Sequence, residues 1–238
     1  FIMMLRQIKE DIDVALEKDP AARNALEVLI LYPGVHALIA YRFNHWLWGL
    51  GMKFIARSLS QIARWVTGIE IHPAAIIGKR FFIDHGMGVV IGETSEVGDN
   101  VFVYQGVTLG GLATKKGKRH PTISDDVVIG AGAKVLGPIK IGCNTKIGSG
   151  SVVLQNVPEY STVIGVPGRV VFSGISSEME DEDGPESFPD PVARAIECML
   201  DRLPEMEKEI RHLKKTLKEN GICDPSPIEE TTRKKIIG

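Results

Sequence analysis

An aliphatic residue recurs at every sixth position through one long stretch of this 238-residue chain. The series comprises Ile123, Ile129, Val135, Ile141, Ile147 and Val153. An amphipathic helix requires spacings of three and four, and a half-buried strand requires a spacing of two, so neither explains a period of six. Such a period, padded with small residues, is typical of a parallel β-helix, whose core residue recurs once per face. A small residue after the aliphatic one lets the backbone turn a corner.

The same period occurs earlier in the chain, in two series displaced from each other by two residues. These series are Ile71, Ile77, Ile83 and Val89, and then Ile91, Val97, Val103 and Leu109. The pattern stops between residues 110 and 122, which predicts a loop that leaves one corner. Three faces of six residues make a coil of about 18 residues, so residues 71–157 predict roughly four coils. The alternative, a sandwich of ordinary short strands, explains three regular series poorly.

The composition is that of a globular protein without a strong charge imbalance. Hydrophobic residues make up 44% of the chain and the formal net charge is −2, so we expect neither nucleic acid nor an anionic membrane as a partner. The cysteines are Cys143, Cys198 and Cys223. Their odd number and wide separation favour a reducing, cytoplasmic setting. No signal peptide is visible, and the apolar segment 28–56 is too interrupted for a membrane span, which favours buried helices.

Residues 1–66 are predicted to form an α-helical cap. Helical spacing relates Leu5, Ile8, Ile12 and Leu16. The dipeptide Asp19-Pro20 favours a break, after which Asp19 caps a new helix. Two further helices are predicted over residues 28–48 and 54–65. The tryptophans expected to pack this cap onto the β-helix are Trp46, Trp48 and Trp65.

Residues 67–172 are the predicted β-helix, with a loop at 111–122, so the fold class is α+β. Residues 173–238 begin with an acidic linker. Apolar residues then alternate spacings of four and three over about 190–220, which predicts a heptad helix. This helix either forms a coiled coil or packs on its own subunit, and a flexible tail is expected after it.

His85 and Glu70 are candidates for a catalytic pair. Glu70 precedes His85 by 15 positions, nearly one coil, so the two side chains can lie on neighbouring coils. A carboxylate that accepts one imidazole N–H fixes the tautomer and makes the other nitrogen more basic. A general base that removes a proton from an alcohol needs this arrangement. The alternative is an ordinary core or surface histidine.

The loop at 110–121 concentrates positive charge in its second half. Arg119 offers a planar fork that suits a carboxylate, and it lies next to His120. The backbone N–H groups of Gly110 and Gly111 are candidates for an oxyanion hole. The alternative is a solvated basic loop.

Three carboxylates complete the candidate site, namely Asp19, Asp84 and Glu93. An amino-acid substrate carries an ammonium group, and buried carboxylates would receive it. Taken singly, each is better explained as a helix cap, a turn residue or a solvated charge.

Residues from about 5 to 172 resemble the serine acetyltransferases, the hexapeptide-repeat enzymes that open cysteine biosynthesis. The matching segments are residues 19–21, 33–38, 45–48, 71–75, 84–85, 90–94, 105–111, 119–121, 129–134 and 163–167. The resemblance implies a left-handed β-helix and the transfer of acetyl from acetyl-CoA to the hydroxyl of L-serine. The products are O-acetyl-L-serine and CoA, acetyl-CoA is a co-substrate, and no cofactor or metal is permanently bound.

The resemblance also implies roles for the candidate residues. His85 becomes the general base and Glu70 its orienting partner, at a position where the family usually has Asp. The serine carboxylate would be bound by Arg119 and His120, and the serine ammonium by Asp19 and Asp84. Glu93 would support the site. The acetyl group or the oxyanion would be bound by Gly110 and Gly111. The proposed partners of the CoA phosphates are Lys134, Lys146 and Arg169.

The resemblance further implies a homotrimer, alone or paired into a dimer of trimers, with active sites between adjacent subunits. It implies feedback inhibition by cysteine and docking of the C-terminus into O-acetylserine sulfhydrylase. Two rival functions remain. One is a hexapeptide acetyltransferase for another hydroxyl acceptor. The other is a zinc enzyme of the γ-carbonic-anhydrase kind, for which His72, His85 and His120 would have to converge on one metal ion.

Overall fold

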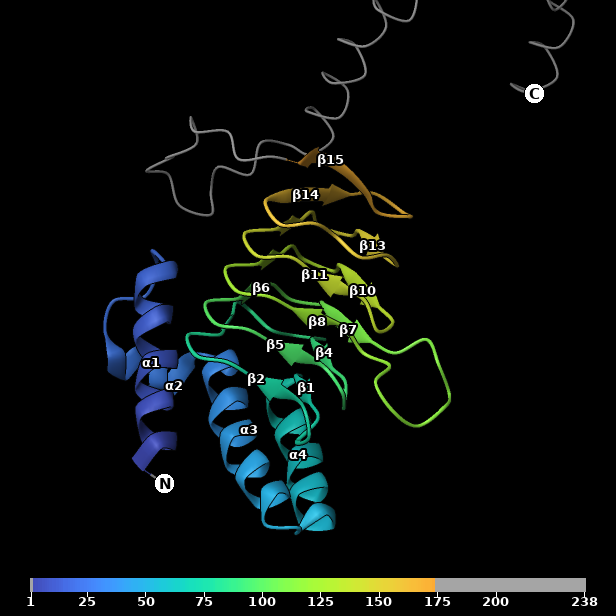
Figure 1. Cartoon of the computed structure of the whole chain (residues 1–238). Coiled ribbons are helices and arrows are strands. Elements are labelled where there is room, and N and C mark those ends of the chain that lie inside the picture. Colours follow the sequence, from blue (N-terminus) through green and yellow to red (C-terminus); the bar gives the residue numbers. More distant parts are fainter. Residues whose placement is uncertain (1, 174–238) are drawn as a thin grey trace, which may run out of the picture. The chain divides into compact units, whose positions relative to one another are not determined.

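The computed structural model describes residues 2–173 (Figure 1). The predicted acidic linker and heptad helix lie outside the described residues and stay predictions. Four helices come first: α1 (Ile2–Lys18), α2 (Ala25–Leu31), α3 (Pro33–Gly49) and α4 (Lys53–Thr67). The strands that follow are β1 (Glu70–Ile71), β2 (Ile76–Ile77), β3 (Phe82–Ile83), β4 (Val90–Ile91), β5 (Glu96–Val97), β6 (Phe102–Val103), β7 (Thr108–Gly110), β8 (Thr122–Ile123), β9 (Val128–Ile129), β10 (Lys134–Leu136), β11 (Lys140–Ile141), β12 (Lys146–Ile147), β13 (Val152–Val153), β14 (Ser161–Ile164) and β15 (Arg169–Ser173).

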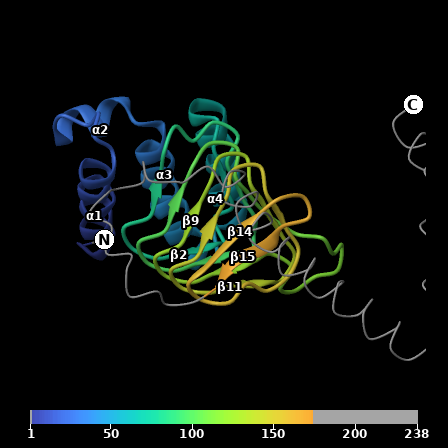
Figure 2. The ribbon, with the colours of Figure 1, turned by 90° about the horizontal axis from the view of Figure 1, so that it is seen from above.

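The strands stack into three sheets, which form the faces of a left-handed β-helix. Face 1 contains β1, β4, β7, β10 and β13, face 2 contains β2, β5, β8 and β11, and face 3 contains β3, β6, β9, β12, β14 and β15. From β1 to β13, consecutive strands visit the faces in turn, so three strands make one coil. The strands β1 to β12 make four complete coils, as the period predicts, and Figure 2 looks along their stack. Pairing is parallel except between β14 and β15.

The aliphatic series form the core. On face 1, Ile71 pairs with Ile91, Ile91 with Leu109, Leu109 with Val135, and Val135 with Val153. These side chains are all buried inside the coils. Glycine after an aliphatic residue also allows close stacking, because a Cβ at Gly142 would lie 2.4 Å from the backbone nitrogen of Glu159. The predicted role of the six-residue period is therefore confirmed.

Two corners depart from the period of 18 residues. Val90 pairs with Thr108, 18 positions on, but Phe82 pairs with Phe102, 20 positions on. The two extra residues lie at residues 84–89, between face 3 and face 1, and we name this segment the His85 corner. Thr108 pairs with Lys134, 26 positions on, because residues 111–121 form the predicted loop. This loop and residues 72–75 and 92–95 lie between face 1 and face 2, and together they form the loop corner.

The cap is helical as predicted, but two of its predicted boundaries are wrong. The helix predicted over 28–48 is broken at Tyr32, and α2 and α3 meet there at 77°. Pro33 causes the break, because proline lacks an N–H and disfavours a helical conformation in the residue before it. Asn24 rather than Asp19 caps α2, since its side chain accepts from the backbone N–H of Glu27. Asp19 accepts from the backbone N–H of Ala21 and so closes a turn.

The tryptophans only partly fulfil their predicted role. Trp48 is half-buried and its ring meets that of His72 edge-on at 5.2 Å between centroids. Trp46 and Trp65 are instead 49% and 85% exposed, so they do not attach the cap to the coils. Arg42 contributes to the attachment, because it is buried, pairs with Asp11 and donates to the backbone carbonyls of Ile77 and Gly78.

The cap also covers the outer side of face 3. Phe82 and Phe102 point outward from this face, stack at 4.9 Å between ring centroids, and are buried beneath Val14 and Val28. Within residues 2–173 no single helix is long and apolar enough to cross a membrane, and only the bent pair of α2 and α3 reaches that length and composition jointly.

Replacing Gly34 with Ala is expected to destabilise the protein. A Cβ at Gly34 would lie 2.2 Å from the carbonyl oxygen of Ile83, so α3 would have to move away from β3. Overpacking of this kind costs about 1–3 kcal/mol. Denaturant unfolding measures the loss, and Gly49→Ala in the same helix is the control, because nothing lies within 4 Å of its Cβ position. Equal stability of the two variants would contradict this account of the contact.

Candidate active site

His85 projects from its corner into solvent. Its side chain is 75% exposed, and its Nε2 lies 3.7 Å from a carboxylate oxygen of Asp84. Its φ of 56° lies in the left-handed region, which is sparsely populated by residues other than glycine and is often found at functional sites. The corner therefore presents an accessible imidazole with a carboxylate beside it.

Asp19 and Tyr32 join this corner from the cap. The hydroxyl of Tyr32 donates to Oδ2 of Asp19 at 2.5 Å. Burial raises the pKa of Asp84, Asp19 adds to the rise, and His85 opposes it. The two carboxylates are thus close enough to interact although 64 residues separate them in the chain, and they form an acidic pair next to His85.

Thr94 organises the loop corner. Its hydroxyl oxygen accepts from the backbone N–H of Arg119 at 3.0 Å and from that of His120 at 3.1 Å. Its own backbone N–H donates to Nδ1 of His120 at 3.2 Å. Because Nδ1 accepts, the neutral imidazole carries its proton on Nε2. Burial is the main cause that lowers the pKa of His120, followed by the charge of Arg119, so the ring is a neutral donor at neutral pH.

Arg119 and His120 pack on glycines. A Cβ at Gly92 would lie 2.0 Å from the His120 ring, and one at Gly111 would lie 3.2 Å from Cγ of Arg119. Gly110 ends β7 at the same corner. The glycines proposed for the oxyanion therefore lie beside the residues proposed for the substrate carboxylate.

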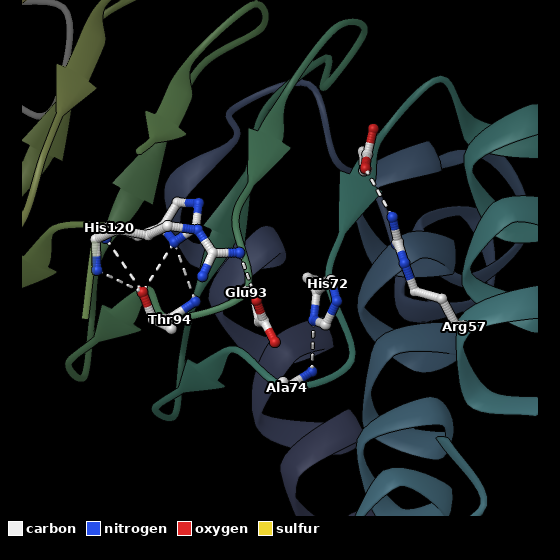
Figure 3. Close-up of polar contacts among 8 residues, drawn as sticks. Arg57, His72, Ala74, Glu93, Thr94 and His120 are labelled. Carbon is white, nitrogen blue, oxygen red and sulfur yellow. Dashed lines mark hydrogen bonds and ion pairs between the residues drawn. The ribbon is translucent and has the colours of Figure 1, made fainter. Parts of the chain in front are cut away.

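Glu93 and His72 complete the loop corner, as Figure 3 shows. Glu93 forms an ion pair with Arg119, whose hydrogen bond lowers the pKa of this carboxyl. Nδ1 of His72 accepts from the backbone N–H of Ala74 at 3.0 Å. Burial, with the charge of Arg57 next in size, lowers the pKa of His72 to about 4, so this ring is also neutral.

Glu70 does not bond to His85 in the described chain. Its carboxylate pairs with Arg57 at 3.6 Å and with Arg64 at 3.3 Å, both from α4. The sequence could not reveal these partners, because they depend on how the turn at Gly68 brings α4 against β1. The expected contact of Glu70 with His85 is thus not made within one subunit of this structure, where Asp84 is the carboxylate beside the imidazole.

The three cations expected to bind CoA do not converge. Lys134 lies on face 1 and donates to the carbonyl oxygen of Gly106. Lys146 and Arg169 lie on face 3. Arg169 borders a groove of about 410 Å³ together with Pro167 and Val170. A cluster that binds one phosphate is therefore not formed by these three side chains in a single subunit.

The described residues give no support to the zinc alternative. No group of three His, Cys, Asp or Glu side chains within residues 2–173 is arranged to hold a metal ion. His72 and His120 lie at the loop corner, whereas His85 lies at the other end of face 1. The sequence patterns did not single out Tyr32 or Thr94, whose side chains bond to Asp19 and to the backbone of Arg119 and His120 respectively. The motif Gly92-Glu93-Thr94 contained the second, but its contacts with a loop 25 positions away were not visible.

The candidate residues thus form two separate groups. Asp19, Asp84 and His85 gather at the His85 corner, and the group of Glu93, Arg119 and His120 gathers at the loop corner. The charges that shift the pKa of Asp84 include none from the loop corner, and those that shift the pKa of His120 include none from the His85 corner. Each corner of one subunit therefore holds only part of the candidate residues.

Comparison with known proteins agrees with the fold and the motifs. The family described as bacterial transferase hexapeptide (six repeats) matches residues 120–155. Serine acetyltransferase of Bacillus licheniformis is 56% identical over 216 residues, which cover 91% of this chain and 96% of the relative. The Bacillus subtilis enzyme is 54% identical with the same coverage of both chains.

Solved structures give the same result. The crystal structure of Neisseria gonorrhoeae serine acetyltransferase superimposes with a TM-score of 0.73 at 41% identity, over 74% of this chain and 68% of that one. A serine acetyltransferase in complex with cysteine superimposes with a TM-score of 0.70 at 42% identity, over 71% and 70% of the two chains. With identity above 50% over about nine-tenths of its length, this chain belongs to the serine acetyltransferase family.

Proposed function

We propose that this protein transfers the acetyl group of acetyl-CoA to the hydroxyl of L-serine, the first step of cysteine biosynthesis. The observation that best supports this proposal is that the candidate anions Asp19 and Asp84 lie at one corner and the candidate cation Arg119 lies at the other. Free serine is a zwitterion, and it requires anions for its ammonium and a cation for its carboxylate. Asp19 and Asp84 supply the first, and Arg119 with the neutral donor His120 supplies the second.

The two half-sites are completed by assembly of a homotrimer in the cytoplasm. In a three-fold ring each subunit offers two different surfaces to its neighbours, so that every interface joins the same two unlike edges. The His85 corner of one subunit can then face the loop corner of the next. Three equivalent sites result, each with the ammonium and the carboxylate of serine held by different subunits. Pairing of two trimers through the caps is a further level of assembly.

The chemistry needs a base, an oxyanion site and an acid. His85 removes the proton of the serine hydroxyl while that oxygen attacks the thioester carbonyl. Backbone N–H groups at Gly110 and Gly111 stabilise the tetrahedral oxyanion. When the intermediate collapses, the protonated His85 gives its proton to the leaving CoA thiolate, so no covalent enzyme intermediate forms. Glu70 orients His85 in the assembled site, for which it must exchange an arginine partner for the imidazole.

Cysteine is expected to compete with serine, because it carries the same ammonium and carboxylate and replaces only the hydroxyl by a thiol. A related serine acetyltransferase is described as a complex with cysteine, and a soybean relative as a complex with serine. Docking of the C-terminus into O-acetylserine sulfhydrylase stays a prediction, and pull-down with and without the last ten residues tests it.

Steady-state release of CoA from acetyl-CoA and L-serine tests the proposed function, with and without cysteine. Two acceptors serve as controls: 3-hydroxypropionate lacks the ammonium, and ethanolamine lacks the carboxylate. Both should be far poorer acceptors than serine, and a sugar hydroxyl should not react. Equal turnover of ethanolamine and serine, or preference for a sugar, would point to the other class of hexapeptide acetyltransferase.

Replacing Arg119 with Ala is expected to raise the KM for serine by roughly tenfold or more, with a smaller effect on kcat. The reason is the loss of a charged hydrogen bond to the substrate carboxylate. Lys115→Ala, in the exposed part of the same loop, is the control for a general loss of positive charge. Initial rates against serine concentration give both constants. An unchanged KM would refute the carboxylate role of Arg119.

A further inference from the structure

Tyr32 contacts the candidate residue Asp19 but has no role in the proposed mechanism. It is the C-cap residue of α2 and the N-cap residue of α3, at the bend forced by Pro33. Its backbone N–H donates to the carbonyl of Val28, and its own carbonyl accepts from the N–H of His36. Its ring packs against the apolar cluster beneath the cap. The residue is therefore held by both helices, and its hydroxyl has a fixed location.

That hydroxyl meets Asp19. It donates to Oδ2 of the carboxylate at 2.5 Å, while Oδ1 accepts from the backbone N–H of Ala21 at 2.8 Å. Each carboxylate oxygen has two lone pairs, so both keep one free for a substrate cation. Burial and the hydrogen bond to Asp19, with the charge of Asp84 also contributing, raise the pKa of Tyr32 to about 12. The phenol hence stays protonated and acts only as a donor here.

The paired carboxylates of Asp19 and Asp84 repel each other electrostatically, and the hydroxyl donor of Tyr32 offsets this repulsion. Asp19 and Asp84 are like charges that lie close together in a half-buried setting, and like charges disfavour each other's ionised form. A hydrogen bond to one carboxylate stabilises its charge and fixes its rotamer before the substrate arrives. Preorganised binding groups lose less entropy when the ligand binds.

We propose that Tyr32 is a positioning residue for the ammonium subsite, and that it acts by holding Asp19 in the orientation that receives the substrate ammonium together with Asp84. This inference rests on the proposed function. It predicts that Tyr32 affects every ligand that carries this ammonium, the inhibitor cysteine included, and has no effect on acetyl-CoA.

The test is Tyr32→Phe, which removes one oxygen and keeps the ring. We expect the KM for serine and the inhibition constant of cysteine to rise together by about tenfold, with the KM for acetyl-CoA unchanged within about twofold. Tyr160→Phe is the control, since it removes the hydroxyl of an exposed tyrosine between β13 and β14, outside both corners. It should leave the KM for serine unchanged.

The same substitution in an Asp19→Asn background separates positioning from a merely structural role. If Tyr32 acts through the Asp19 carboxylate, Tyr32→Phe should add little to the effect of Asp19→Asn. A full further tenfold rise, or a wild-type KM in the single variant, would overturn the inference. Failure of the wild-type protein to acetylate serine would instead overturn the proposed function, so the two failures are distinguishable.

Discussion

Replacing His85 with Ala lowers kcat by roughly 10²–10⁴, the usual contribution of a general base. The KM for acetyl-CoA should stay near its wild-type value, because the imidazole moves a proton and does not hold the nucleotide. The ring is 75% exposed, so added imidazole should enter the vacated space and restore part of the turnover. Pre-steady-state and steady-state CoA release measure these effects.

His36→Ala is the control for the His85 experiment. This histidine lies on α3 and its ring bonds to the backbone carbonyl of Leu29, away from both corners. It should retain turnover. Wild-type turnover of His85→Ala would remove the base from the proposed mechanism, and Asp84 or the solvent would have to be considered in its place.

Mixing two impaired variants should restore activity if each site joins two subunits. His85→Ala damages only the His85 corner and Arg119→Ala damages only the loop corner. In a three-fold ring of randomly mixed subunits, an intact interface forms wherever an Arg119→Ala subunit offers its His85 to the loop corner of a His85→Ala subunit. About one quarter of all interfaces meet this condition by chance.

The experiment unfolds and refolds the two variants together and measures CoA release at a serine concentration well below the KM of Arg119→Ala. We expect about one quarter of the wild-type rate, far above either variant alone. The control is the double variant with both His85→Ala and Arg119→Ala, refolded alone, and it should stay inactive. Absence of any gain in the mixture would mean that both corners act within one subunit, which would contradict the proposed interface.

The β-helix was predicted well from the sequence, because the six-residue pattern that specifies it is local and repeated. Each aliphatic residue of the six-residue series needs only its own face and the coils above and below. Even the shift of two residues between Val89 and Ile91 had a structural meaning, since two additional residues form the His85 corner. The loop was predicted for the same reason, as an interruption of an otherwise regular pattern.

The cap and the side-chain partners were harder to predict. Apolar residues continue through Tyr32, so periodicity concealed the bend that Pro33 imposes. Exposed Trp65 looks like a core residue by composition alone. The contacts of Glu70 with Arg57 and Arg64 depend on how α4 packs against β1, and no periodic signal encodes that placement.

The proposed base His85 and the proposed carboxylate ligand Arg119 both lie where the repeat is interrupted. Around the loop the ladder stays in register, since Thr108 still pairs with Lys134 despite the eleven residues that leave the coil between β7 and β8. Strand pairing therefore continues across the loop at residues 111–121 without a change of register. The β-helix and the outer part of the loop are thus specified by different residues, so residues 112–117 can be replaced in a search for other acceptor alcohols while the paired strands keep their register.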